Sequence, residues 1–295
     1  MSNRYYYDTE FLEGIQDKTF MGIKYGKTPP TIDLISIGIV SDDNREYYAI
    51  SKDFNLKEAW NRYDIKIEQM YGDMRNTYPE GRKTKVYWIR ENVLRPIFKE
   101  LNKLQDEKFL TGMRDRYFTY SNMKYLINKY GKSNKQIAKE IKDFISMETL
   151  LNKKIVDHYG FTSDALRTFE GRMACIKHNW GSLQFYGYYS AYDHVVLCWL
   201  FGKMIDLPDE FPYYTIDLKQ ELDNILTKEY DGVILRHGKS ANNIVEIRNL
   251  PNLEARLEWI KNYAKYPHYP KQTNEHSSIH DARWNKELYN FLQTI

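Results

Sequence analysis

Residues 4–10 have the sequence Arg-Tyr-Tyr-Tyr-Asp-Thr-Glu, a short β-prone run that ends in two carboxylates. Aromatic residues favour strands, so residues 4–7 are expected to form a strand. Residues two apart on a strand point to the same face, which would place Asp8 and Glu10 together at its end. Neighbouring like charges repel, and such pairs usually persist with a cation between them. Most Asp-x-Glu triplets are nevertheless solvated surface pairs, so the triplet alone does not define a site.

Two further strands are predicted after the first. Residues 32–40 form an almost continuous apolar run, which indicates a buried strand, and residues 46–50 indicate the strand that returns from it. The turn-forming triplet Asp42-Asp43-Asn44 separates them. The chain therefore opens with three adjacent strands, two of them joined by a hairpin. The segment with Gly22 and Gly26 is one residue short of the phosphate-binding loop motif and is expected to be a flexible loop.

The pattern changes to helices between about residues 56 and 182. Apolar residues recur at helical spacing in residues 90–104 and 133–144. Later segments alternate between the two types of element. The sequence predicts a strand at 183–189, an apolar helix at 192–204, a hairpin at 231–250, a helix at 253–263 and a last helix from Ser277 or Ser278 to Leu292.

Two more acidic residues stand near predicted helix starts. Asp193 lies in the first turn of helix 192–204, where an acid can simply stabilise the helix N-terminus. Asp281 follows His276 by five residues. A helix that begins between them would let the imidazole lie over the carboxylate, whereas one unbroken helix would separate them. His276 and His280 have a zinc-like spacing, but a third ligand and the zinc-protease glutamate are missing, which disfavours zinc.

Composition excludes several classes of protein. A chain of 295 residues with 42% hydrophobic and 15% aromatic residues can build a sizeable core, which excludes wholesale disorder. No apolar run approaches the roughly 18 residues needed to cross a bilayer, and the N-terminus lacks the apolar segment of a secretion signal, so a cytoplasmic protein is expected. A net charge of +3 does not by itself indicate nucleic-acid binding. Cys175 and Cys198 are too few for a disulfide framework or a cysteine-based zinc site.

Taken in order, these residues resemble the DEDDh 3′–5′ exonucleases, which have a ribonuclease H-like mixed sheet flanked by helices. The first motif of the family matches Asp8-Thr9-Glu10, the second matches Asp193, and the third, His-x4-Asp before a terminal helix, matches His276 and Asp281. Further segments look like the mycobacterial-type exoribonuclease branch, which also occurs in bacteriophages. They include Tyr-Asp-Thr-Glu-Phe (7–11), Ala-Tyr-Asp-His-Val (191–195) and His-Asp-Ala-Arg-Trp-Asn (280–285).

The resemblance implies an α/β fold in one exonuclease domain over residues 1–295, with helical and hairpin insertions near 63–85, 105–132, 146–182 and 223–269. It implies hydrolysis of single-stranded RNA from the 3′ end to nucleoside 5′-monophosphates. Two divalent cations are expected, Mg2+ with Mn2+ as a substitute, because carboxylates and phosphate oxygens are hard ligands. The expected metal ligands are Asp8, Glu10, Asp193 and Asp281, with His276 as general base; Phe11, Thr9 and Tyr192 are the expected substrate-binding residues.

Other interpretations stay open at this point. The same site would serve single-stranded DNA or short signalling oligonucleotides, and a catalytically silent module would only bind nucleic acid. The presence of all four carboxylates and the histidine argues against the silent module. Phe11 can equally be a core aromatic. Two basic groups are candidates for contacting the nucleic-acid strand: the lysines of residues 124–142, and Arg82 with Lys83 and Lys85. A solvated helix face explains the first group more simply. Because the family often dimerises, a homodimer is favoured.

Overall fold

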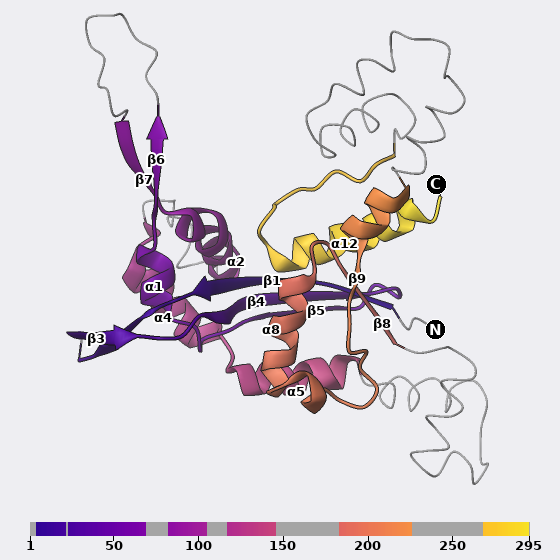
Figure 1. Cartoon of the computed structure of the whole chain (residues 1–295), viewed down its shortest axis with the longest axis horizontal. Coiled ribbons are helices and arrows are strands. Elements are labelled where there is room, and N and C mark those ends of the chain that lie inside the picture. Colours follow the sequence, from indigo (N-terminus) through magenta and orange to yellow (C-terminus); the bar gives the residue numbers. More distant parts are fainter. Residues whose placement is uncertain are drawn as a thin grey trace, which may run out of the picture.

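The computed structural model describes residues 4–21, 23–68, 82–104, 117–145, 183–225 and 268–294. Its centre is a mixed five-stranded sheet in the order β5-β4-β1-β8-β9, flanked by helices (Figure 1). The central strand β1 runs antiparallel to β4 and parallel to β8. The predicted ribonuclease H-like α/β fold is therefore confirmed. The strands of the sheet are β1 (Arg4–Gly14), β4 (Thr31–Ser41), β5 (Glu46–Ile50), β8 (Gln184–Gly187) and β9 (Ile216–Asp217).

Side chains of β1 alternate between two helical layers, because successive residues of a strand point to opposite faces. Tyr5 and Tyr7 are buried in the core that α5 (Asn134–Ile145) and α8 (Ala191–Phe201) share with the sheet. Tyr6 is buried in a second core with α12 (Ser278–Leu292), which lies on the other side of the sheet in Figure 1. The alternation therefore directs Asp8 and Glu10 toward the α12 side and Thr9 toward the α8 side.

A third core surrounds Leu12 and Ile35, toward the C-terminal end of β1. The helices that contribute to it follow one another along the chain. They are α1 (Leu56–Asn61), the π-helical turn η1 (Arg90–Leu94), α2 (Arg95–Lys103) and α4 (Tyr120–Tyr130). The helix predicted at residues 90–104 corresponds to η1 and α2, so that prediction is confirmed.

Two hairpins correct the sequence-based interpretation. β2 (Asp17–Phe20) and β3 (Ile23–Lys27) pair where a flexible loop was expected. β6 (Asp64–Glu68) and β7 (Arg82–Val86) pair within the insertion expected near 63–85, for which no strands had been specified. All described side chains of β3 and β6 are exposed. β3 has no buried face and gives little hydrophobic signal, whereas residues 64–68 alternate as a strand does but are too short a run to stand out from their polar surroundings.

The remaining predicted elements agree with the structure where it describes them. The predicted helix 192–204 is α8, which ends at Phe201 because Gly202 adopts φ 115. A short 3-10 turn, η4 (Met204–Asp206), and helical residues 218–225 come next in the chain. The predicted hairpin 231–250, the predicted helix 253–263, Cys175 and most of the predicted insertions lie outside the described residues. Within the described ranges, no helix has the length and apolar content needed to span a membrane.

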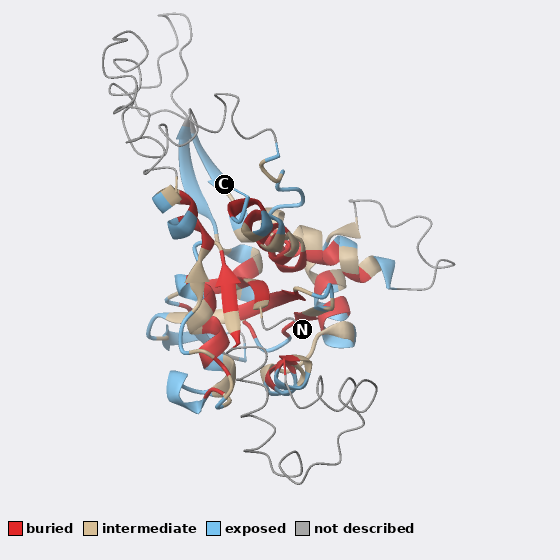
Figure 2. Ribbon diagram, turned by 90° about the vertical axis from the view of Figure 1, so that its right-hand side faces the viewer, coloured by how far each residue is buried: buried red, intermediate tan, exposed pale blue. Residues whose placement is uncertain are grey.

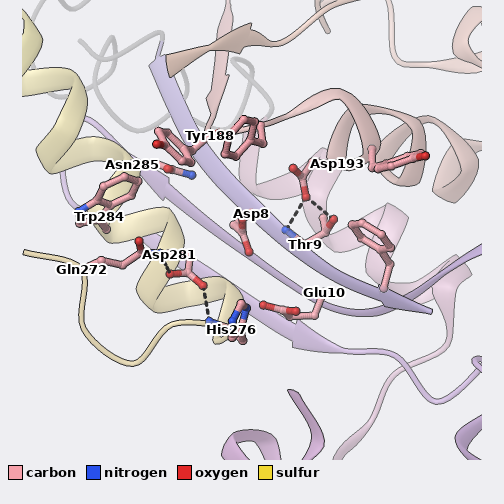
Figure 3. A pocket seen from close by; sticks show the side chains of 13 residues that line it. Asp8, Thr9, Glu10, Tyr188, Asp193, Gln272, His276, Asp281, Trp284 and Asn285 are labelled. Atoms are coloured by element: carbon pink, nitrogen blue, oxygen red, sulfur yellow. Dashed lines mark hydrogen bonds between the residues drawn. The ribbon is translucent and has the colours of Figure 1, made fainter. Parts of the chain in front are cut away.

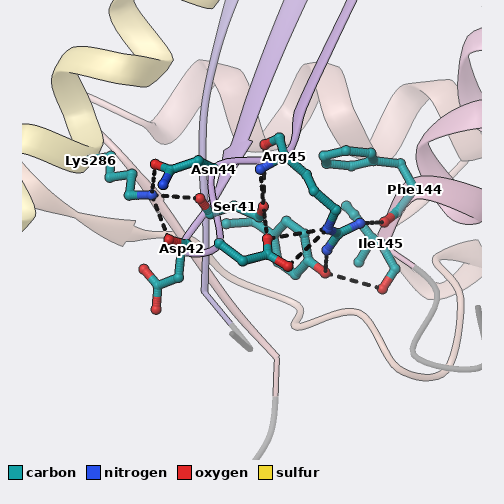
Figure 4. Close-up of polar contacts among 9 residues, drawn as sticks. Ser41, Asp42, Asn44, Arg45, Phe144, Ile145 and Lys286 are labelled. Carbon is teal, nitrogen blue, oxygen red and sulfur yellow. Dashed lines mark hydrogen bonds and ion pairs between the residues drawn. The ribbon is translucent and has the colours of Figure 1, made fainter. Parts of the chain in front are cut away.

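The β4–β5 turn is attached to helices on both sides of the sheet (Figure 4). On one side, Lys286 of α12 donates hydrogen bonds to the backbone oxygens of Ser41 and Asp42 and to Oδ1 of Asn44, at 2.7–2.8 Å. On the other, Arg45 donates to the backbone oxygen of Phe144 in α5 at 3.0 Å. The Lys286 bonds thus tie α12 to the β4–β5 turn, and the Arg45 bond ties the same turn to α5.

Candidate active site

All five predicted catalytic residues line one cavity of about 310 Å³. Asp8 and Glu10 come from β1, with Asp281 and His276 from the α12 side and Asp193 from α8 (Figure 3). The predicted substrate-binding residues line the same cavity. Its walls are formed by Asp8, Thr9, Glu10, Phe11, Tyr188, Tyr189, Tyr192, Asp193, Gln272, His276, Asp281, Trp284 and Asn285.

Three carboxylates meet at the floor of the cavity. One oxygen each from Asp8, Glu10 and Asp281 lies within 4.8 Å of the other two, which is a spacing that could hold a metal ion. Glu10 and Asp281 are buried and Asp8 is partly buried. Carboxylate oxygens are the hard ligands that Mg2+ and Mn2+ prefer, so the donor set fits these cations.

Asp193 approaches from the α8 side and is held by Thr9. The backbone N–H and the hydroxyl of Thr9 both donate to Oδ1 of Asp193, at 2.9 and 2.5 Å. Both residues are buried. The hydroxyl of Thr9 thus orients the Asp193 carboxylate. Both bonds end on Oδ1, so Oδ2 of Asp193 accepts neither of them.

The site disfavours ionised carboxylates in the absence of a cation. Burial raises the pKa of Asp8 and of Glu10 well above the ordinary range, and neighbouring carboxylates raise both further. Burial also raises the pKa of Asp193 to about 6, against the lowering effect of the Thr9 hydrogen bonds. The pKa of Asp281 is raised by burial as well, although the Gln272 amide and the His276 N–H oppose the shift.

These raised pKa values link stability to pH with a definite sign. These carboxyl groups bind protons more tightly in the folded protein than in the unfolded chain. The stabilisation that protonation of these groups gives the folded state is therefore fully present below about pH 4. It is lost as pH rises through the folded-state pKa, which for Asp193 is about 6. A divalent cation would replace the protons and offset the repulsion at neutral pH.

His276 lies in a constrained loop immediately before α12. Its φ of 66 is in the left-handed region, which side chains other than glycine rarely occupy and which recurs at functional sites. Its backbone N–H donates to Oδ2 of Asp281 at 2.9 Å, and its ring contacts Trp88 edge-on at 4.7 Å between centroids. Because α12 begins at Ser278, between His276 and Asp281, both side chains reach the cavity, as the spacing predicted.

The first turn of α12 rests directly on the backbone of β4. Gly38 pairs with Asp8 across the sheet, and a Cβ atom at Gly38 would lie 2.4 Å from backbone atoms of Ser278 and Ile279. Two hydrogen bonds add to this close approach. Ser277 Oγ donates to Glu100 Oε1 at 2.9 Å, and the hydroxyls of Ser278 and Ser36 lie 3.1 Å apart.

Aromatic side chains form the walls above the carboxylates. The rings of Phe11 and Tyr192 are tilted against one another with centroids 5.7 Å apart. Phe11 also packs against the core under α8 while it lines the cavity, and Tyr192 is 52% exposed. On the opposite wall, the rings of Tyr188 and Trp284 meet edge-on at 4.9 Å.

Sequence reasoning missed several residues that support the site. Trp284 and Asn285 follow Asp281 by three and four positions, a helical spacing that could have identified them. The Asn285 amide donates to the backbone oxygen of Tyr7 at 3.0 Å, joining α12 to β1. Gln272 donates to Oδ1 of Asp281, nine residues later, at 2.7 Å, but lies in a loop that carries no spacing signal. Trp88 is distant in sequence from His276, which it contacts.

The lysines of residues 124–142 are not among the residues that line the cavity. They belong to α4, α5 and the short segment between these helices. Lys132 of this segment pairs with Glu140 of α5 at 2.6 Å. Whether these lysines contact a nucleic-acid strand or form a solvated helix face stays a prediction.

Comparison with known proteins places the chain near exoribonucleases. No protein-family model matches it. It is similar to two curated proteins, the 3′–5′ exoribonucleases of Mycobacterium tuberculosis strains CDC 1551 and H37Rv. In each case 24% of residues are identical over 217 residues, covering 74% of this chain and 72% of the relative. This chain is therefore similar to a mycobacterial 3′–5′ exoribonuclease over most of its length.

Proposed function

We propose that this protein is a two-metal-ion 3′–5′ exonuclease that hydrolyses single-stranded RNA to nucleoside 5′-monophosphates. The observation that carries the proposal is the group of carboxylates from Asp8, Glu10 and Asp281, whose oxygens lie within 4.8 Å of one another. Such clustering of like charges is costly unless a cation accompanies it. The similarity to relatives named 3′–5′ exoribonucleases supports the reaction, its direction and RNA as the substrate.

The four carboxylates have distinct roles in this proposal. Asp8 would hold both cations, Glu10 and Asp281 would complete the site of the one beside the attacking water, and Asp193 would support the other. When bound, Mg2+ or Mn2+ would neutralise charge on the scissile phosphate and activate the water. Thr9 would keep one oxygen of Asp193 in place through its two hydrogen bonds.

His276 would act as the general base and accept the proton of the attacking water at a ring nitrogen. Two contacts support this role. The hydrogen bond from its backbone N–H to Asp281 keeps the residue next to the carboxylates, and the Trp88 ring limits rotation of the imidazole. Positioning of the base relative to the reacting atoms is the contribution expected from this loop.

The 3′-terminal nucleotide would occupy the cavity between the aromatic walls. Phe11 and Tyr192 would stack on its base, because aromatic rings bind unpaired bases largely without regard to sequence. The carboxylates below would face the scissile phosphate. We further propose that residues 1–295 form one exonuclease domain in which the insertions near 63–85, 105–132, 146–182 and 223–269 modify substrate access.

The test is nucleotide release from single-stranded RNA and DNA 20-mers of matched sequence, labelled at either end. Purified protein is incubated with Mg2+, Mn2+ or chelator. The proposal predicts stepwise shortening of 5′-labelled RNA, release of labelled mononucleotide from 3′-labelled RNA, and no reaction in chelator. Faster degradation of DNA would reassign the substrate, and intact strands under every condition would contradict an exonuclease.

A further inference from the structure

The β6–β7 hairpin is a separate two-stranded sheet with an exposed apolar surface. Its strands pair antiparallel from Asp64↔Val86 to Glu68↔Arg82 and hydrogen-bond to no strand of the five-stranded sheet within the described residues. The hairpin projects from the body of the molecule, and its residues 64–67 and 83–85 are exposed (Figure 2). Ile65 and Ile67 are 58% and 57% exposed. An isolated two-stranded ribbon is only marginally stable in water, and exposed apolar side chains on it are not stabilised by packing. Exposed apolar surface of this kind is typical of sites that bind another molecule.

One side of this hairpin combines basic, aromatic and aliphatic side chains. Directly paired residues of an antiparallel ribbon share a face, so Ile65 lies beside Lys85 and Ile67 beside Lys83. Tyr63 belongs to the same side, since Nζ of Lys85 lies 4.1 Å from the centre of its ring. We call this surface, formed by Tyr63, Ile65, Ile67, Lys83 and Lys85, the basic face. It contains no acidic residue; Asp64 and Lys66 alternate to the other side.

Aromatic contacts connect the basic face to the cavity. The rings of Tyr63 and Tyr87 lie 5.8 Å apart, and the guanidinium of Arg90 lies 3.8 Å from the centre of the Tyr87 ring. Trp88, the next residue along the chain, contacts His276 edge-on. A series of aromatic side chains, with Arg90 and Lys85 against two of them, therefore leads from the proposed general base to the hairpin.

We propose that the basic face binds the part of a single-stranded nucleic acid that lies upstream of the nucleotide in the cavity. This inference rests on the proposed function and adds a second contact region for the same substrate. Ammonium groups would pair with phosphates while Tyr63 stacks on a base, the combination by which proteins bind single strands. Residues on one face of a strand recur about every 7 Å, so Tyr87 to Lys83 offers a path of about 13 Å.

Charge favours nucleic acid over a second copy of this chain as the occupant. In a two-fold contact each surface meets its own equivalent. Lys85 would then approach the same lysine of the other copy, and none of the five residues that define the basic face is acidic. A polyanion instead complements the ammonium groups.

The test measures binding without cleavage. A 5′-fluorescein single-stranded RNA 12-mer is titrated by fluorescence anisotropy in chelator, over a series of salt concentrations. Lys85→Gln is compared with Lys66→Gln, a matched change on the opposite side of the same ribbon. Tyr63→Leu tests the ring, and circular dichroism verifies that each variant is folded.

Lys85→Gln should weaken binding by about threefold and reduce the magnitude of the salt slope by about 0.7, the value for one phosphate contact on a single strand. Tyr63→Leu should weaken binding about fivefold with an unchanged slope. Lys66→Gln should change neither quantity appreciably. Nucleotide release by the wild-type protein, measured separately with Mn2+, reports on the proposed function independently.

Three results would overturn the inference. The first is equal affinity and slope for Lys85→Gln and Lys66→Gln in a protein that releases nucleotides, which would leave the exonuclease proposal intact. The second is a failure of the wild-type protein to bind the 12-mer. The third is a wild-type dimer that becomes a monomer in the Ile67→Lys variant, as measured by light scattering, without loss of RNA affinity. That result would assign the basic face to a contact between chains.

Discussion

Substitution of Gly38 by alanine tests whether the close contact between α12 and β4 sets the geometry of the site. The added Cβ would lie 2.4 Å from backbone atoms of Ser278 and Ile279, whereas ordinary contacts begin at 3.4 Å. Backbone atoms cannot move aside as a flexible side chain can, so the first turn of α12 must shift by about 1 Å. Asp281 and His276 would move with this turn, away from Asp8 and Glu10.

The expected consequence is a loss of activity larger than the loss of stability. A misplacement of about 1 Å at a reacting centre can reduce the rate on the order of 100-fold, and overpacking costs about 1–3 kcal/mol of unfolding free energy. The assay is kcat for nucleotide release from single-stranded RNA with Mn2+, together with urea unfolding. Gly26→Ala is the matched control, because its added Cβ would meet only Cδ of the Lys18 side chain, at an ordinary contact distance of 4.0 Å. Wild-type kcat in a folded Gly38→Ala variant would refute the reasoning.

Three further predictions concern the surroundings of the carboxylates. In chelator at pH 7.5, Asp193→Asn should have an unfolding free energy on the order of 3 kcal/mol higher than the wild type, because a neutral amide replaces the buried ionised carboxylate. This gain should vanish below about pH 4, where the wild-type carboxyl is protonated. Urea unfolding at both pH values measures the gain, and a gain independent of pH would contradict the assigned burial effect. Thr9→Val should raise the Mn2+ concentration needed for half-maximal activity about tenfold, because a charge-assisted hydrogen bond to Asp193 is lost. Thr9→Ser is the control that keeps this hydrogen bond. Equal Mn2+ dependence of Thr9→Val and the wild type would show that the bond does not support the site. Lys286→Met should lower the unfolding free energy by about 1–3 kcal/mol through its three lost hydrogen bonds and leave metal affinity, measured by calorimetry, unchanged.

The central strands could be predicted because their sequence signal is local and strong. Residues 32–40 are apolar almost throughout, as expected for a strand buried on both faces, and turn residues separate them from residues 46–50. β1 is longer than expected, since it continues past Glu10 to Gly14. The register between β1 and β4 shifts between Glu10 and Phe11. Such irregularities are common in strands next to functional sites, but no residue type in this segment predicts one.

The five proposed catalytic residues were expected from the resemblance to the DEDDh exonucleases, and strand alternation and helix starts explain why the fold can bring such side chains together. Asp8 and Glu10 share a face by the two-residue period, and the start of α12 at Ser278 lets His276 and Asp281 approach one another. The supporting contacts could not be predicted in the same way. Ser277 and Glu100, which hold this helix start in place, are 177 positions apart and meet only through the fold.

The exposed hairpins escaped prediction for a different physical reason. A periodicity argument detects the burial of one face, and neither β3 nor the described part of β6 has a buried face. The alternation of Ile65 and Ile67 with Lys66 is nevertheless typical of a strand. It indicates a ribbon whose apolar residues face outward, as the structure shows.

The most direct test of the proposed function is the rate of nucleotide release by Asp8→Asn relative to the wild type, on 5′-labelled single-stranded RNA with Mn2+. The substitution preserves the size of the side chain and removes the charge that would hold both cations. If the carboxylate cluster is a two-metal catalytic centre, the rate should fall by about 1,000-fold or more while the fold is retained. Hydrolysis within tenfold of the wild-type rate would contradict the assignment of this cavity as the active site.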